Sequence, residues 1–270
     1  MVPIRNVDGF DVTYTRNYED FEFRLKAYYG ASDFIINDND WTEEVIELSP
    51  LYGTSLELSA FDWLFTLKYS HGTYEDAHRL APSYENDIAQ LAPIWPGANY
   101  FFEALSLDDF TIDYYAVGGR YDTEHFSYYA ELTRISGTSS FVKEINSGYV
   151  SAVYHHGNFD YFLGYAKTHA PTNVLRPENE LIIPPALYPP GIHEAFTFMT
   201  ASVIAAASHQ NTIFAGYSWH INDNWSFKVQ LDVTDVGAYG EALWRNPAPY
   251  VFLEQDEQVK TWFINLSFNF

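Results

Sequence analysis

The chain has 270 residues, with 14 Lys and Arg against 36 Asp and Glu, and carries a formal charge of -22. This balance excludes a general nucleic-acid binder, whose affinity depends on neutralising phosphates. Because cysteine is absent, a disulfide scaffold, a thiolate metal site and a cysteine nucleophile are excluded as well. The chain has no run of 18 apolar residues, so we expect no transmembrane helix. The first residues, MVPIRNVDGF, lack the apolar core of a signal peptide.

Apolar and polar residues alternate with period two in many segments, which indicates β-strands with one apolar and one polar face. The pattern is clearest in FEFRLKAYYG (21–30) and in WSFKVQLDVT (225–234), whereas GYVSAVYHH (148–156) fits either phase. We expect eleven strands in all, near residues 9–18, 20–31, 46–61, 63–75, 109–122, 125–136, 146–156, 158–170, 209–221, 225–237 and 258–270.

Short and long connections alternate along the chain. The short ones are NYED, FDW, DTEH, HHGN and NDN, and medium or long loops separate them. A β-sandwich or propeller has no reason to gather every long connection at one end, whereas a membrane barrel has tight periplasmic turns and extended extracellular loops. The predicted strands also reach the 9–11 residues or so that a tilted spanning strand needs. The sequence therefore predicts an all-β transmembrane antiparallel β-barrel, with residues 1–270 as a single domain.

Aromatic residues gather beside the short turns. The pairs are Tyr18 and Phe21, Phe61 and Trp63, Tyr121 and Phe126, Phe159 and Tyr161, and Trp219 and Trp225. This position predicts an aromatic girdle at a membrane interface, where a ring lies in hydrocarbon and its polar tip reaches the headgroups. The alternative is the ordinary aromatic core of a soluble sheet.

The C-terminal segment TWFINLSFNF places Trp262, Ile264, Leu266, Phe268 and Phe270 on one face. This pattern resembles the assembly signal of Gram-negative outer-membrane proteins. The segments YVSAVYHHGNFDYFLGYAKTH (149–169) and QNTIFAGYSWHINDNWSFKVQLDVTDV (210–236) resemble the C-terminal part of porin-like proteins, and IRNVDGFDVTYTRNYEDFEFRLKAYYG (4–30) is similar to a hairpin from their middle. The resemblance implies a porin in the bacterial outer membrane.

An odd number of strands conflicts with this resemblance. Bacterial single-chain barrels have an even strand number and both termini on the periplasmic side. We therefore expect that N-terminal strands are missing. The resemblance implies that about five are missing from a sixteen-stranded porin, with residues 1–7 belonging to its pore-constricting loop. The alternative is one irregular strand hidden in a loop, and we interpret 193–208 as part of a loop.

Charges within the strands are predicted to face the lumen, because a charge on the lipid face is costly. The predicted pore-lining residues are Arg24, Lys26, Glu57, Lys68, Asp113, Glu131, Asp160, Lys228 and Asp232, with Asp11 and Glu22 on the same face. Mixed-sign side chains in a wet pore would set ion selectivity. The alternative is that they solvate the lumen and pair across strands as structural bridges.

Other candidate sites are weak. NDNDWTEE (37–44) lacks the turn glycine and spacing of an EF-hand, so we interpret it as a solvated loop. His155 and His156 point to opposite faces of a strand and lack a partnered acidic ligand, and GYSWH (216–220) falls short of a nucleophile elbow. The loop 82–102 could offer Trp95, Tyr100 and Phe101 to a solute. We therefore expect no enzyme, no cofactor and no metal.

The leading hypothesis is a passive channel for small hydrophilic solutes or ions, with a cation preference from the acidic loops. Its expected partners are outer-membrane lipids and lipopolysaccharide, a homotrimer is left open, and nucleic acid is excluded. One competing hypothesis is a closed barrel that works through its loops as an adhesin, receptor or structural protein. The other is a soluble carbohydrate-binding β-sandwich.

Overall fold

The computed structural model describes residues 7–39, 42–74, 93–95, 110–138, 144–170, 209–222, 224–237 and 257–268, without the side chains of 33–46. Its strands are β1 (Asp8–Asn17), β2 (Phe21–Asn39), β3 (Thr42–Ala60), β4 (Trp63–Tyr74), β5 (Thr111–Asp122), β6 (Phe126–Gly137), β7 (Ile145–His156), β8 (Phe159–His169), β9 (His209–His220), β10 (Trp225–Val236) and β11 (Glu257–Phe268). All eleven predicted strands are therefore confirmed.

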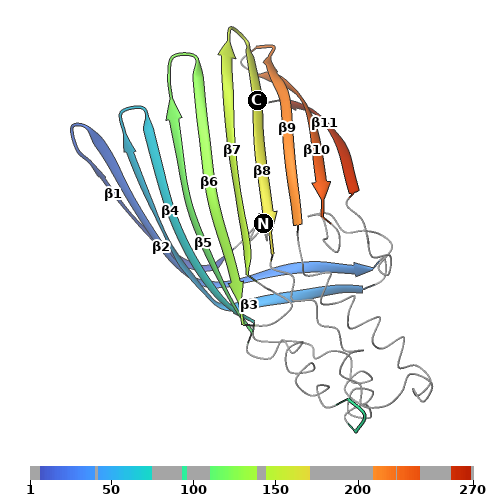
Figure 1. Cartoon of the computed structure of the whole chain (residues 1–270). Helices are drawn as coiled ribbons and strands as arrows, with labels where there is room; N and C mark the ends of the chain where they lie inside the picture. The colour runs from blue at the N-terminus through green and yellow to red at the C-terminus, as the bar shows by residue number, and fades with distance from the viewer. Residues whose placement is uncertain are drawn as a thin grey trace.

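The strands form one curved antiparallel sheet in which each strand pairs with its neighbours in sequence (Figure 1). Short turns join β1 to β2, β3 to β4, β5 to β6, β7 to β8 and β9 to β10, and we call this edge of the sheet the short-turn end. The opposite edge is the long-loop end. The single sheet confirms the predicted all-β antiparallel architecture with short turns at one end, and it does not support a sandwich, which needs two packed sheets. Within the described residues, β1 and β11 are the edge strands.

The sheet has two chemically different faces. We call the face that carries Arg24, Lys68 and Lys228 the polar face, and the face that carries Leu25 and Leu67 the apolar face. Of the exposed large hydrophobic side chains on the described strands, all except Tyr149 and Phe263 lie on the apolar face. A soluble monomer rarely exposes so large a contiguous apolar surface, so this face requires an apolar environment.

The predicted aromatic cluster beside the short turns forms a band on the apolar face. Ring centroids lie 4.3 Å apart for Trp63 and Tyr121, 5.9 Å for Phe159 and Trp219, and 4.6 Å for Trp225 and Phe268. From Trp63 to His71, where this face turns polar, β4 rises by about 26 Å along its own axis. At a tilt of about 40° this corresponds to ~20 Å of depth, close to the apolar band of a membrane barrel.

The first predicted long loop is mostly strand. β2 continues to Asn39 and β3 begins at Thr42, so the interpretation of 37–44 as a solvated loop is wrong. Segments 34–36 (FII) and 45–46 (VI) are β-branched or aromatic and pair there, which favours strand over loop. The pairing shifts between Gly30 and Ser32, and such a bulge bends a hairpin. The distal hairpin, residues 32–39 and 42–48, accordingly runs crosswise at the long-loop end (Figure 1).

The most buried hydrophobic side chains lie mainly toward the long-loop end. They include Leu48 and Leu51 beside the bend, Tyr74 at the end of β4 and Phe110 just before β5. Trp95 is only 1% exposed, so it does not present a free ring to solutes as predicted, and Tyr100 and Phe101 lie outside the described residues. No helix in the described part of the chain is long and apolar enough to cross a membrane.

Candidate functional site: the polar face of the sheet

The register places eight of the nine predicted pore-lining residues on the polar face. Directly paired positions share a face, and the rows Lys26–Ser55–Lys68 and Asp160–Ser218–Lys228 each cross three consecutive strands. The eight are Arg24, Lys26, Glu57, Lys68, Glu131, Asp160, Lys228 and Asp232. Whether this face lines a pore stays a prediction.

The ninth residue, Asp113, lies on the apolar face, and its predicted inward position is wrong. Asp113 pairs with His71, whereas the polar-face residue Lys68 pairs with Ala116. The segment TIDYYAVGG (111–119) carries polar and apolar residues in both phases, so its alternation alone does not fix its orientation. Neighbouring strands fix it instead, because a strand's phase follows from its hydrogen-bonded pairing.

Salt bridges near β1, β2 and β3 connect the predicted charges. Arg24 Nη2 donates to Glu22 Oε1 at 3.0 Å and Nη1 to Glu57 Oε2 at 3.4 Å, and Lys26 Nζ lies 3.2 Å from Asp11 Oδ2. All five side chains are at least one-third exposed. Pairs of this exposure contribute about 0.2–1 kcal/mol each. Their main effect is therefore to hold opposite charges at fixed places on a wet surface.

A second cluster lies at the short-turn end, and we call it the histidine–aspartate cluster. It contains Arg120, Asp122, Ser127, His155, Asp160 and His220. Asp160 Oδ1 lies 2.7 Å from His155 Nδ1, and Asp160 Oδ2 lies 2.8 Å from His220 Nε2. Arg120 Nε lies 2.7 Å from Asp122 Oδ2. Four strands, β5 to β8, and the end of β9 contribute to it, so it fastens consecutive hairpins together.

Three of these side chains are connected in the atom order of a serine hydrolase triad. Ser127 Oγ lies 2.9 Å from His155 Nε2, and His155 Nδ1 contacts Asp160. In a hydrolase the serine hydroxyl donates its proton toward the histidine. Here Ser127 donates to Asp122 Oδ1 at 2.6 Å instead, so His155 Nε2 must be the donor toward Ser127 Oγ. Ser127 is also only 4% exposed. The geometry therefore describes a hydrogen-bonded chain from Asp160 through His155 and Ser127 to Asp122, not an activated nucleophile.

Sequence reasoning missed this cluster. The prediction that His155 lacks an acidic partner is wrong, because Asp160 contacts it across the turn after β7. The available signal in the sequence was the Gly157–Asn158 pair, which is typical of a two-residue hairpin turn. Such a turn places His155 directly opposite Asp160, and in the structure Gly157 adopts the φ of 57° that it needs. His220 could not be assigned in this way, since it is 60 residues from Asp160. Among the described residues, no group of three or more His, Asp or Glu side chains is arranged to hold a metal ion.

No protein family model matches the chain, and no curated protein matches it. Among solved structures, Salmonella typhi OmpF in complex with daunomycin is similar over 95% of this chain and 61% of that chain, with 14% sequence identity and a TM-score of 0.46. The open form of the ferric-catecholate import receptor Fiu from E. coli K12 is similar over 95% of this chain and 48% of that chain, with 11% identity and a TM-score of 0.33. The chain thus spans less than two thirds of either of these proteins.

Proposed function

We propose that the chain forms the wall of a water-filled outer-membrane channel through which small hydrophilic solutes and ions diffuse passively. The observation that carries the proposal is the division of one sheet into an apolar face and a polar face with half-exposed charges of both signs. An apolar outside and a charged inside are what a membrane channel built from strands requires. The proposed channel needs no cofactor and catalyses no reaction.

We further propose a preference for cations. On the polar face of the described strands, outside the distal hairpin, acids outnumber bases by eight to five. The acids are Asp11, Glu22, Glu57, Asp122, Glu131, Asp160, Asp232 and Glu257, and the bases are Arg24, Lys26, Lys68, Arg120 and Lys228. The chain as a whole carries -22. A negative surface raises the local concentration of cations and so favours their entry.

The test is electrical. Purified, folded, full-length protein in a neutral planar bilayer should produce ohmic conductance steps, and a KCl gradient should give a reversal potential of the sign set by potassium. Protein that migrates as folded on an unheated gel but never conducts would count against a channel. A reversal potential of the sign set by chloride would be consistent with a channel but would contradict the proposed preference for cations.

A further inference from the structure

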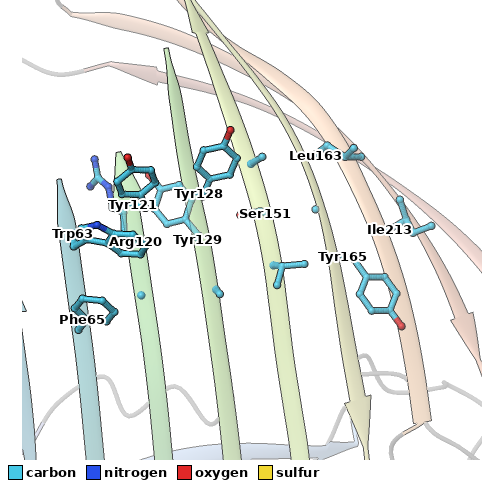
Figure 2. A pocket seen from close by; sticks show the side chains of 15 residues that line it. Trp63, Phe65, Arg120, Tyr121, Tyr128, Tyr129, Ser151, Leu163, Tyr165 and Ile213 are labelled. Atoms are coloured by element: carbon cyan, nitrogen blue, oxygen red, sulfur yellow. The ribbon is translucent and has the colours of Figure 1, made fainter. Parts of the chain in front are cut away.

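A groove of about 910 Å³ lies on the apolar face, over β5, β6 and β7. Its floor is made of small or short side chains, since Gly119, Ala130 and Val150 lie side by side in one row and Ala152 lies in the next. Larger side chains form the two walls. They are Trp63, Phe65, Tyr121 and Tyr128 on one side and Leu163, Tyr165 and Ile213 on the other, as Figure 2 shows.

A second groove of about 500 Å³ continues the first toward the long-loop end. Val150 and Tyr165 line both grooves, so the two form one continuous furrow along β7. The side chain of Leu132 packs over Gly148 here, since a Cβ atom at that position would come within 2.6 Å of Leu132 Cδ2. We call the combined groove the β7 furrow.

The long-loop end of the β7 furrow is polar and basic. Lys167, His169 and Asn146 line it. His169 Nδ1 lies 2.9 Å from His209 Nδ1. Within the described residues Lys167 forms no ion pair, and its direct neighbours in the sheet are Gly148 and Asn211. The charged groups around this end are Arg134 and Glu144, which pair with one another at 2.8 Å, and Asp235, which lies beyond Asn211 in the same row. Lys167 is therefore a cation available to a ligand at the head of an apolar channel.

The length of the furrow matches one leaflet of a bilayer. From Ala152 to Asn146 the strand rises by about 20 Å. At the ~45° tilt of a spanning strand this corresponds to a depth of ~14 Å, about half of the ~30 Å hydrocarbon core. From its polar end at Asn146 the furrow thus extends inward by about the depth of one leaflet.

We infer that the β7 furrow binds a phosphate-bearing lipid of the leaflet on the long-loop side. The acyl chain lies over Gly119, Ala130 and Ala152, and the phosphate contacts Lys167 and His169. The inference rests on the proposed membrane placement of the sheet. The complementarity of charge selects this occupant: a neutral acyl chain fits the apolar floor, and an anionic headgroup fits the cationic end. A second copy of the chain would need a protruding apolar ridge with an acidic end to fill the same space.

The test uses delipidated full-length protein, refolded in detergent and titrated with diphosphorylated lipid A as the probe. Native mass spectrometry counts the bound lipid. Wild-type protein should retain one lipid molecule per chain more strongly than any further lipid molecules that it binds. Ala152→Phe and Ala130→Phe, which fill the floor, should lower its occupancy about tenfold, and Lys167→Gln should lower it severalfold. Ala215→Phe is the matched control, because Ala215 lies in the same row as Ala152 on the apolar face but does not line the furrow.

Several results would overturn the inference. One is equal occupancy in Ala152→Phe, Ala215→Phe and wild type, and another is equal retention of dephosphorylated lipid A. If the protein forms a dimer without bound lipid, and Ala152→Phe abolishes that dimer, the occupant of the furrow is a second copy of the chain instead. Conductance is recorded in parallel for wild type and Ala152→Phe. A conducting wild type that retains no lipid would remove only this inference, whereas a lipid-binding protein that never conducts would remove only the proposed channel.

Discussion

The imidazole Nδ1 of His71 lies 2.9 Å from Oδ1 of Asp113, on the apolar face of the sheet. The hydroxyl of Tyr69 donates to the same carboxylate oxygen at 2.9 Å, and the ring of Tyr52 stacks on His71 with centroids 4.9 Å apart. The cluster is near the long-loop end, where, in the proposed membrane placement, the cost of polar groups on a lipid-facing surface falls toward zero. It marks the depth at which the apolar band ends.

Removing this carboxylate should destabilise the sheet. Asp113→Ala leaves the donors of Tyr69 and His71 partly buried without their acceptor, which costs about 1–3 kcal/mol. Urea unfolding in lipid vesicles, followed by tryptophan fluorescence, measures the loss. Ser136→Ala, at the position that pairs with Asp113 across β5 and β6, is the control. Equal free energies of unfolding for the two variants would show that the cluster contributes nothing.

Neutralising one carboxylate should change ion selectivity on the polar face and leave it unchanged on the apolar face. Glu131→Gln removes a negative charge from the polar face and should shift the reversal potential in a KCl gradient toward the chloride value. Asp113→Asn removes the same charge from the apolar face and should leave the reversal potential unchanged. Lys68→Gln should shift it in the opposite direction from Glu131→Gln. A shift with Asp113→Asn as large as that with Glu131→Gln would contradict the assignment of the faces.

The histidine–aspartate cluster should behave as a structural unit. Asp160→Asn weakens its contacts with both His155 and His220, and a double-mutant cycle with His155→Gln should give a coupling energy of about 0.5–3 kcal/mol. Unfolding free energies of the four proteins supply the cycle. A coupling energy indistinguishable from zero would mean that the contact between His155 and Asp160 does not contribute to stability.

Ser127 should be unreactive despite its triad-like neighbours. Its hydroxyl donates to Asp122, and its side chain is buried. Folded protein incubated with a fluorophosphonate should show no added mass at Ser127, while a serine hydrolase in the same tube is labelled. Labelling of wild type that Ser127→Ala abolishes would instead establish a nucleophile and contradict the proposal that the chain catalyses no reaction.

Deletion of the distal hairpin should widen the path for ions. Because this hairpin runs crosswise at the long-loop end, replacing residues 33–46 with a Gly-Ser turn should raise single-channel conductance. An unchanged conductance would place the hairpin outside the ion path. As a control, the variant must still migrate as folded on an unheated gel, which requires that β2 and β3 keep their pairing from Phe21 to Gly30.

Local sequence patterns were sufficient for the strands and the short turns. FEFRLKAYYG and WSFKVQLDVT each place bulky and polar residues on opposite faces, so the orientation of Arg24 and Lys228 could be predicted from their own neighbours. The orientation of Asp113 could not, because TIDYYAVGG is mixed in both phases. The extended hairpin was missed for a related reason, since the acidic stretch NDNDWTEE hides the short β-branched runs on either side of it.

The sequence by itself determined the antiparallel meander, its alternation of short and long connections and most of its polar face, because these follow from a period of two and from turn composition, both local properties. Tertiary structure alone decided which residues meet across strands. His220 reaches Asp160, Tyr69 and His71 reach Asp113, and the small side chains of β5, β6 and β7 align into the β7 furrow. Each of these depends on the register between strands, which is set by hydrogen bonding along the whole sheet.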